Sequence, residues 1–182
     1  MQNRLIEGRI DTANETAIAY LNAGYALKVA LVYEDALTRQ WASQVRDLMV
    51  EQVGPESPRC TEWKVSDLRE RRAFSEGVTA LAQADVIVMS LYEVERLPAA
   101  FYLWVNVWLQ ERAGRPGALV ALIAPPDELG PGAKFAGANE TRRYLSAVAG
   151  QGRLEFLLKE CSRPGEPNPV RREDIMQLAK AA

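Results

Sequence analysis

The fold is decided by the stretch Lys28-Val-Ala-Leu-Val-Tyr-Glu-Asp35, together with the later stretch Asp85-Val-Ile-Val-Met-Ser90. Both are nearly continuous apolar runs of strand length, which is typical of parallel strands covered by helices on both faces. The first run ends in two carboxylates and the second in a hydroxyl. In a doubly wound α/β domain, the carboxyl ends of two such strands meet at the crevice where ligands bind.

Strands and helices are predicted to alternate from residue 27 to the end of the chain. Five segments read as strands, at 27–33, 60–65, 86–91, 118–124 and 154–158. Apolar residues that recur every three or four positions predict helices at 37–49, 74–82, 99–112 and 139–150, and another near the C-terminus. Because parallel crossovers are right-handed, we expect a three-layer α/β/α doubly wound domain whose five-stranded parallel sheet has the order 2-1-3-4-5.

Length and composition predict one α/β domain. The chain has 182 residues, of which 48% are hydrophobic and 25% charged. We expect an extension with a short helix over 1–26, the domain over 27–161, and a linker with a C-terminal helix over 162–182. The net charge of -2 argues against a nucleic-acid partner. No apolar run approaches the roughly 20 residues that span a bilayer, and no signal peptide is recognisable, so we expect a cytoplasmic protein without a membrane partner.

The scarcity of histidine and cysteine narrows the chemistry. Without any histidine, the chain cannot build a Ser-His-Asp or Cys-His site or a histidine-ligated metal site. Two cysteines, Cys60 and Cys161, are too few for a zinc cluster and are expected to be buried apolar residues. Any catalysis must therefore use carboxylates, hydroxyls, amines or a cofactor.

The polar residues at two strand ends resemble those of a receiver domain. Glu34-Asp35 and Lys159 follow the first and last strands, where receivers of bacterial response regulators carry a magnesium-binding acidic pair and a lysine. The chain departs from receivers at Ser90, where the phosphoacceptor aspartate would stand, and at Ala124, where a hydroxyl residue would contact the phosphoryl group. The resemblance implies a regulatory protein without a phosphoacceptor, with Glu34 and Asp35 as the candidate Mg²⁺ ligands.

A second resemblance covers more of the chain, from residue 27 to residue 158. Trp63-Lys-Val-Ser-Asp-Leu68 is similar to the second strand of the NAD(P)H-dependent FMN reductase and flavodoxin group. Ala84-Asp-Val-Ile-Val-Met-Ser-Leu-Tyr-Glu93, followed by Leu97-Pro-Ala-Ala and Trp108-Leu109, resembles its third strand, flavin-contacting loop and following helix. This resemblance implies a flavodoxin-like fold and an FMN-dependent oxidoreductase.

The first loop departs from that group, whose members wrap the FMN phosphate in a loop rich in Gly, Ser and Thr. This chain has Tyr33-Glu-Asp-Ala-Leu-Thr-Arg39 at that place. A phosphate at a helix N-terminus gains from free backbone N–H groups, whereas Glu34 and Asp35 bring their own negative charge. At about 4 Å and an effective dielectric constant of about 20, each like charge costs about 4 kcal/mol. We therefore expect no cofactor, with FMN or Mg²⁺ as alternatives.

The predicted crevice combines the residues at the strand ends with nearby loops. Lys159, at the end of the last strand, is expected to pair with Glu34 or Asp35. Ser90 is expected to be an ordinary residue at the end of its strand. The loop 125–137, rich in Gly and Pro, is expected to be a lid, a binding loop or a disordered segment. The candidate ligand-binding residues are Glu34, Asp35, Thr38, Arg39, Ser90, Tyr92, Glu93 and Lys159.

The predicted helix 99–112 is apolar on more than one face, which indicates either deep burial or an interface. We expect a homodimer or a partner protein to contact Phe101, Tyr102, Trp104 and Trp108, with cover by the terminal helices as the alternative. The interpretation favoured by the sequence is a non-catalytic, receiver-like regulatory or binding protein that acts through protein contacts. The alternative is a flavin-dependent NAD(P)H oxidoreductase of the FMN reductase type.

Overall fold

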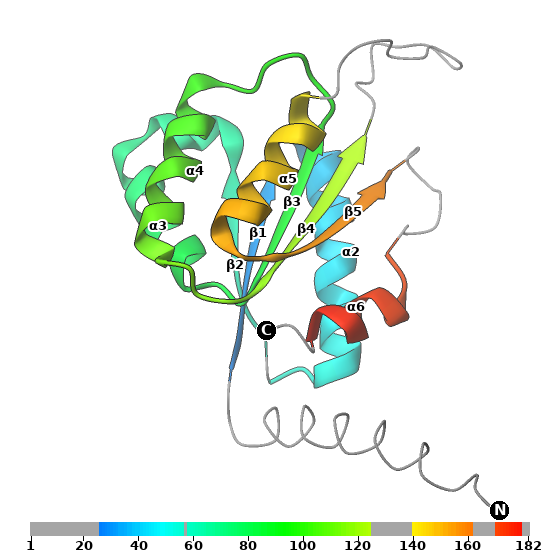
Figure 1. Ribbon diagram of the computed structural model, residues 1–182. Coiled ribbons are helices and arrows are strands. Elements are labelled where there is room, and N and C mark those ends of the chain that lie inside the picture. Colours follow the sequence, from blue (N-terminus) through cyan, green and yellow to red (C-terminus); the bar gives the residue numbers. More distant parts are fainter. Residues whose placement is uncertain (1–25, 57, 125–139, 162–169, 180–182) are drawn as a thin grey trace, which may run out of the picture.

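A single parallel sheet organises the computed structural model, which describes residues 26–56, 58–124, 140–161 and 170–179 (Figure 1). Within these ranges, five strands are hydrogen-bonded in the order β2-β1-β3-β4-β5, and every neighbouring pair is parallel. The predicted order 2-1-3-4-5 is confirmed. The strands are β1 (Leu27–Tyr33), β2 (Pro58–Lys64), β3 (Val86–Tyr92), β4 (Ala118–Ala124) and β5 (Glu155–Glu160).

Helices cover both faces of the sheet and complete the three layers (Figure 1). One face packs against α2 (Ala36–Val53) and α6 (Arg172–Ala179). The other face packs against the 3₁₀ helix η1 (Val65–Arg69), α3 (Arg71–Gln83), α4 (Ala99–Arg112) and α5 (Glu140–Gly152). The helix predicted before residue 26 and the loop 125–137 lie outside the described residues.

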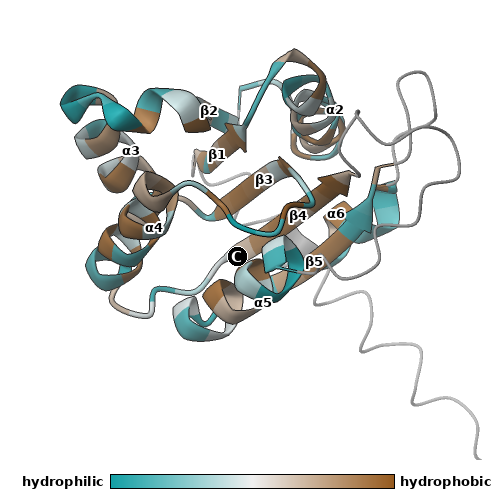
Figure 2. Ribbon diagram, turned by 90° about the horizontal axis from the view of Figure 1, so that it is seen from above, coloured by the Kyte–Doolittle hydropathy of each residue, from teal (hydrophilic) through white to brown (hydrophobic). Residues whose placement is uncertain are grey.

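The three central strands form the core, which Figure 2 shows as the hydrophobic middle of the sheet. Side chains alternate between the two faces: Ile87 and Met89 of β3 face the layer of α3, α4 and α5, whereas Val88 faces α2. All seven residues of β4 are buried. The edge strand β2 is more polar and exposed, so that Cys60 is exposed rather than buried as predicted, whereas Cys161 is buried as expected.

The aromatic residues of α4 are covered by the chain itself. Phe101, Trp104 and Trp108 are completely buried in the core formed with α3 and α5. The Trp104 indole lies against Gly77 of α3, where a Cβ atom would come within 2.9 Å of the ring, and its Nε1–H donates to the Phe74 carbonyl at 3.2 Å.

This burial corrects the prediction of an interface at Phe101, Trp104 and Trp108, because these side chains present no surface to a partner. Of the alternative, cover by the terminal helices, the part that concerns the C-terminal helix is wrong, since α6 packs on the opposite face of the sheet; the predicted N-terminal helix lies outside the described residues. Tyr102 is partly exposed and stacks edge-on against Tyr144 of α5 at 4.7 Å between ring centroids. A homodimer stays a prediction.

A buried arginine joins the loops at the amino edge of the sheet. Arg112, the last residue of α4, is 3% exposed and donates to four backbone carbonyls: those of Leu81 in the last turn of α3 and Ala84 just after it, and those of Arg115 and Pro116 before β4. Its guanidinium thereby connects the C-terminal end of α3 to the segment before β4. None of the helices in the described ranges has the length and apolarity needed to cross a membrane.

Candidate ligand-binding crevice

The carboxyl ends of β1 and β3 lie side by side, with Tyr33 paired in register with Ser90. The chain leaves β1 toward α2 on one face and leaves β3 toward α4 on the other face, so the strand order reverses here (Figure 1). In open α/β sheets such a reversal opens a crevice at the carboxyl edge, which is the usual place for a ligand. The predicted placement of the crevice between β1 and β3 is therefore consistent with the structure.

A closed hydrogen-bonded turn connects β1 to α2. Asp35 is the N-cap of α2, and its Oδ1 accepts from the Thr38 backbone N–H at 2.9 Å. The Thr38 hydroxyl oxygen, fully buried, accepts in return from the backbone N–H groups of Glu34 at 3.0 Å and Asp35 at 2.9 Å. This is a capping box with threonine in place of glutamate. The amides of Glu34, Asp35 and Thr38, which an anion could have used, are thus bonded within the turn.

The Glu34 carboxylate crosses from β1 to β3. Its Oε2 accepts from the Tyr92 backbone N–H at 3.0 Å. Burial raises the pKa of Glu34 above its ordinary value, and the charge of Asp35 adds to this, although the Tyr92 amide opposes it. Glu34 therefore lies between the two strand ends as a partly buried carboxyl group.

Asp35 has the opposite electrostatic balance. Its Oδ2 accepts from the Tyr92 hydroxyl at 2.8 Å, in addition to the bonds from Thr38. Burial acts to raise the pKa of Asp35, but the hydrogen bonds from Thr38 and Tyr92 outweigh it, and the net pKa is lowered. Of the predicted crevice residues, the structure therefore brings together Glu34, Asp35, Thr38 and Tyr92.

The two predicted cations are both paired away from this group. Arg39 forms an ion pair with Glu62 of β2 at 2.7 Å, and its guanidinium lies 5.7 Å from the centre of the Tyr33 ring. Lys159 pairs with Asp174 of α6 at 2.9 Å. The expected pairing of Lys159 with Glu34 or Asp35 is therefore wrong, because α6 brings a nearer carboxylate to β5.

Ser90 and Glu93 point into the protein. Ser90 is fully buried, and its hydroxyl has no hydrogen-bond partner among the described residues, so it does not line the crevice. Glu93 is 4% exposed and accepts from the Thr141 backbone N–H at 3.2 Å and from Arg142 Nε at 2.7 Å. Glu93 thus holds the N-terminus of α5 to the loop after β3.

Thr141 and Arg142 were missed by the sequence reasoning, although they fix this loop. The Thr141 hydroxyl accepts from the Val94 backbone N–H at 3.1 Å and lies 3.1 Å from the Tyr92 carbonyl, to which it can donate. A threonine in the first turn of a predicted helix is a signal that could have identified the first of them. Nothing local in the sequence marks Arg142 as the partner of Glu93, which is 49 positions away.

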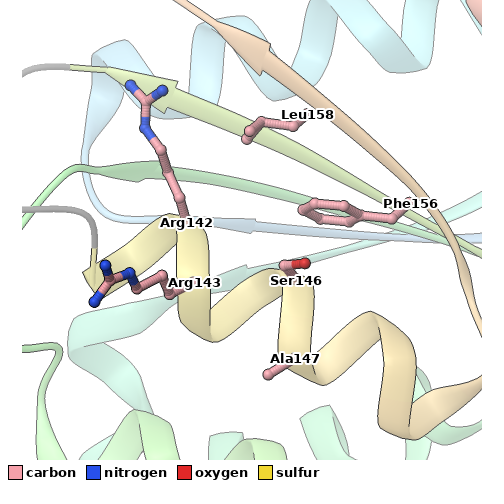
Figure 3. Close-up of a pocket in the computed structure, with 6 residues that line it drawn as sticks. All are labelled: Arg142, Arg143, Ser146, Ala147, Phe156 and Leu158. Atoms are coloured by element: carbon pink, nitrogen blue, oxygen red, sulfur yellow. The ribbon is translucent and has the colours of Figure 1, made fainter.

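Outside the crevice, acidic clusters and a surface groove are the other places where a ligand could bind. Across the ranges that the structure describes, no three Cys, Asp or Glu side chains come together in a way that could hold a metal ion. A groove between α5 and β5 is lined by Arg142, Arg143, Ser146, Ala147, Phe156 and Leu158 (Figure 3). Arg142, at one end of this groove, is already bonded to Glu93 and Glu160.

Comparison with solved structures shows the fold to which this crevice belongs. An oxidoreductase from Corynebacterium diphtheriae is 14% identical over 85% of this chain and 93% of its own, with a TM-score of 0.54. The fold is flavodoxin-like. An azoreductase from Bacillus anthracis (14% identity, 85% and 95% coverage, TM-score 0.49) and an NAD(P)H:quinone oxidoreductase from Methanothermobacter marburgensis (12%, 85% and 96%, 0.49) are also similar. No protein-family model and no curated protein sequence matches the chain.

These comparisons correct two expectations. The favoured interpretation, a receiver-like regulator without catalysis, is corrected, because the similar structure with a TM-score of 0.54 is an oxidoreductase and favours the alternative. The expectation of no cofactor is corrected for the same reason, since the alternative that this oxidoreductase favours is one whose resemblance implies a flavin.

The phosphate of FMN does not fit the turn after β1 in this structure. The backbone amides of Glu34, Asp35 and Thr38 are bonded within the turn, and the Tyr92 amide is bonded to the Glu34 carboxylate. A phosphate there would meet two carboxylates in place of free N–H donors. The first loop, whose sequence departs from that of the FMN reductase group, therefore offers this phosphate none of these four amides as a free donor.

Proposed function

We propose that the protein is a flavin-dependent oxidoreductase whose flavin binds at the carboxyl edge of the sheet, beside the loop that follows β3. The observation that carries the proposal is the flavodoxin-like sheet, which the chain shares over 85% of its length with an oxidoreductase. The chain's lack of histidine supports it, because acid–base chemistry near neutral pH is then limited and a cofactor would supply the redox chemistry.

The loop between β3 and α4 is the proposed contact for the isoalloxazine ring. Its ends are fixed, because the Val94 backbone N–H donates to Thr141 and the Leu97 backbone N–H donates to the Tyr102 hydroxyl at 3.2 Å. Between these bonds, Glu95 and Arg96 are exposed. A loop that is anchored at both ends can present its middle residues to a ligand without a large ordering cost. The resemblance of Ala84–Glu93 to the flavin-contacting segment of FMN reductases supports the same location.

Purification and flavin titration test this proposal. We expect the protein either to retain a yellow flavin or to bind added riboflavin or FMN, and the loaded protein to oxidise NAD(P)H with a quinone as acceptor. Free flavin at the same concentration, without protein, is the control for non-enzymatic turnover. A folded, colourless protein that changes the fluorescence of neither flavin would overturn the proposal.

A further inference from the structure

We propose that the Glu34 carboxylate takes the place of a cofactor phosphate, and that the crevice therefore selects a flavin without a 5′-phosphate, namely riboflavin, over FMN. The inference rests on the proposed flavin-dependent function and adds the chemical class of flavin that the site accepts. It is carried by the contacts of four residues at the ends of β1 and β3: Glu34, Asp35, Thr38 and Tyr92.

The backbone N–H donors in the turn after β1 are already hydrogen-bonded. A phosphate bound at the start of a helix is held by backbone N–H groups that have no other partner. In the turn after β1, the Thr38 hydroxyl and the Asp35 carboxylate take up three of these groups. The Tyr92 N–H, at the neighbouring strand end, donates to Glu34. An incoming phosphate would have to break these bonds before it formed its own.

The side chains at the end of β1 are also acidic. Glu34 and Asp35 are adjacent, and both carboxylates are directed to Tyr92, one to its backbone and the other to its hydroxyl. Arg39 and Lys159, the cations that the sequence offers for compensation, are paired with Glu62 and Asp174. A dianionic phosphate placed at this strand end is therefore repelled, whereas the uncharged ribityl hydroxyl of riboflavin can donate a hydrogen bond to a carboxylate.

Riboflavin and FMN share the same ring and ribityl chain, so the ratio of their dissociation constants isolates the effect of the phosphate. We expect the purified protein to bind riboflavin at least about tenfold more tightly than FMN at low ionic strength, measured by flavin fluorescence. Added salt should reduce this preference. Salt screens the repulsion between the carboxylates and the phosphate of FMN, whereas it has little effect on the binding of uncharged riboflavin.

The variant Glu34→Gln tests the residue. Glutamine keeps an oxygen acceptor for the Tyr92 N–H and removes the charge, so we expect the preference for riboflavin to fall several-fold. Glu111→Gln is the matched control, because Glu111 is an exposed residue at the C-terminal end of α4, at the opposite edge of the sheet. It changes the net charge equally and should leave the ratio unchanged. If Glu34→Gln does not fold, Asp35→Asn makes the same test of the adjacent charge.

The outcomes separate this inference from the proposed function. FMN binding as tight as riboflavin binding in the unchanged protein would overturn the inference and leave the flavin-dependent function in place. An undiminished preference in folded Glu34→Gln would overturn the role of Glu34. Failure of both flavins to bind would overturn the proposed function and the inference with it.

Discussion

Thr38 is the residue on which the turn after β1 depends most. Its hydroxyl accepts from two backbone N–H groups, those of Glu34 and Asp35, and is fully buried. Thr38→Val keeps the shape and leaves both N–H groups without this partner, so we expect a loss of about 1–3 kcal/mol in the free energy of unfolding. Urea denaturation measures it. Thr79→Val, at an exposed position of α3, should change stability by less than about 0.5 kcal/mol. Equal effects of the two variants would contradict the assigned role.

Glu34 and Asp35 should affect stability with opposite dependence on pH. The raised pKa of Glu34 means that the folded state holds this proton more tightly than the unfolded state, so its contribution falls as the pH rises above the ordinary value of 4.5. Glu34→Gln should therefore stabilise the protein at neutral pH and lose this advantage in acid.

Asp35 is the matched opposite. Its lowered pKa gives stability that is present above the ordinary value of 3.8 and is lost as the pH falls through the lowered value. Asp35→Asn should therefore destabilise the protein at neutral pH and have a smaller effect in acid. Urea midpoints of both variants at neutral and acidic pH check the signs, and parallel pH profiles would contradict them.

At the scale of single residues, the sequence predicted that Glu34 and Asp35 follow the first strand. It did not predict the partners of the other crevice residues. Carboxylates that follow a strand could be placed at the crevice, because all strands of a parallel sheet end at the same edge. The partners of Glu93 and Lys159 depend on how α5 and α6 are set against the sheet, and those helices come about 50 and 15 positions later in the chain. No local pattern fixes such a distance.

Among the elements, α3 and α4 make the closest contact between helices. Gly77 of α3 allows the Trp104 ring to approach, since an added Cβ would lie 2.9 Å from it. Gly77→Ala should therefore destabilise the protein by about 1–3 kcal/mol through overpacking, despite the better helix propensity of alanine. Gly150→Ala is the control: it lies in α5 with nothing within 4 Å of an added Cβ, and should stabilise by about 0.5–1 kcal/mol. Thermal or urea unfolding gives both values, and a stabilising Gly77→Ala would contradict the packing.

The predicted elements agree best with the structure where burial is complete. The bounds predicted for β1, β4 and α4 are those observed, because continuous apolar runs leave little choice. The edge strands β2 and β5 were placed two residues or fewer from their observed starts, since their polar residues give a weaker alternation. Helix α4 shows the limit of this reasoning. A helix that is apolar on several faces must be buried, but its sequence does not show whether other helices of the chain or a partner protein bury it.

For the whole molecule, Arg112 is the main connection at the amino edge of the sheet. Its guanidinium donates to four carbonyls, two at the C-terminal end of α3 and two in the segment before β4. Arg112→Met should lower the free energy of unfolding by at least about 3 kcal/mol, because these carbonyls lose a buried charged donor. Arg72→Met removes an exposed arginine paired with Glu76 and should cost less than about 1 kcal/mol. Equilibrium denaturation of both variants tests this, and similar losses would contradict it.

The topology of the whole molecule was predictable, and its function was not. Right-handed crossovers and two early central strands are enough for the order 2-1-3-4-5. The same fold serves both receivers and flavin reductases, so function depends on a few groups at the carboxyl edge. In this chain those groups, Glu34 and Asp35, resemble the acidic pair of receivers, whereas the fold is shared with an oxidoreductase.

The polar borders of the sheet bear on how the protein behaves when it is crowded. Both edge strands contain charged residues: β2 carries Arg59, Glu62 and Lys64, and β5 carries Glu155, Lys159 and Glu160. A strand from a second molecule that tried to extend the sheet would bring its own side chains against these ions and would bury them without water. The interior strands, which are apolar enough to aggregate, are thereby shielded by neighbours that resist fibre growth.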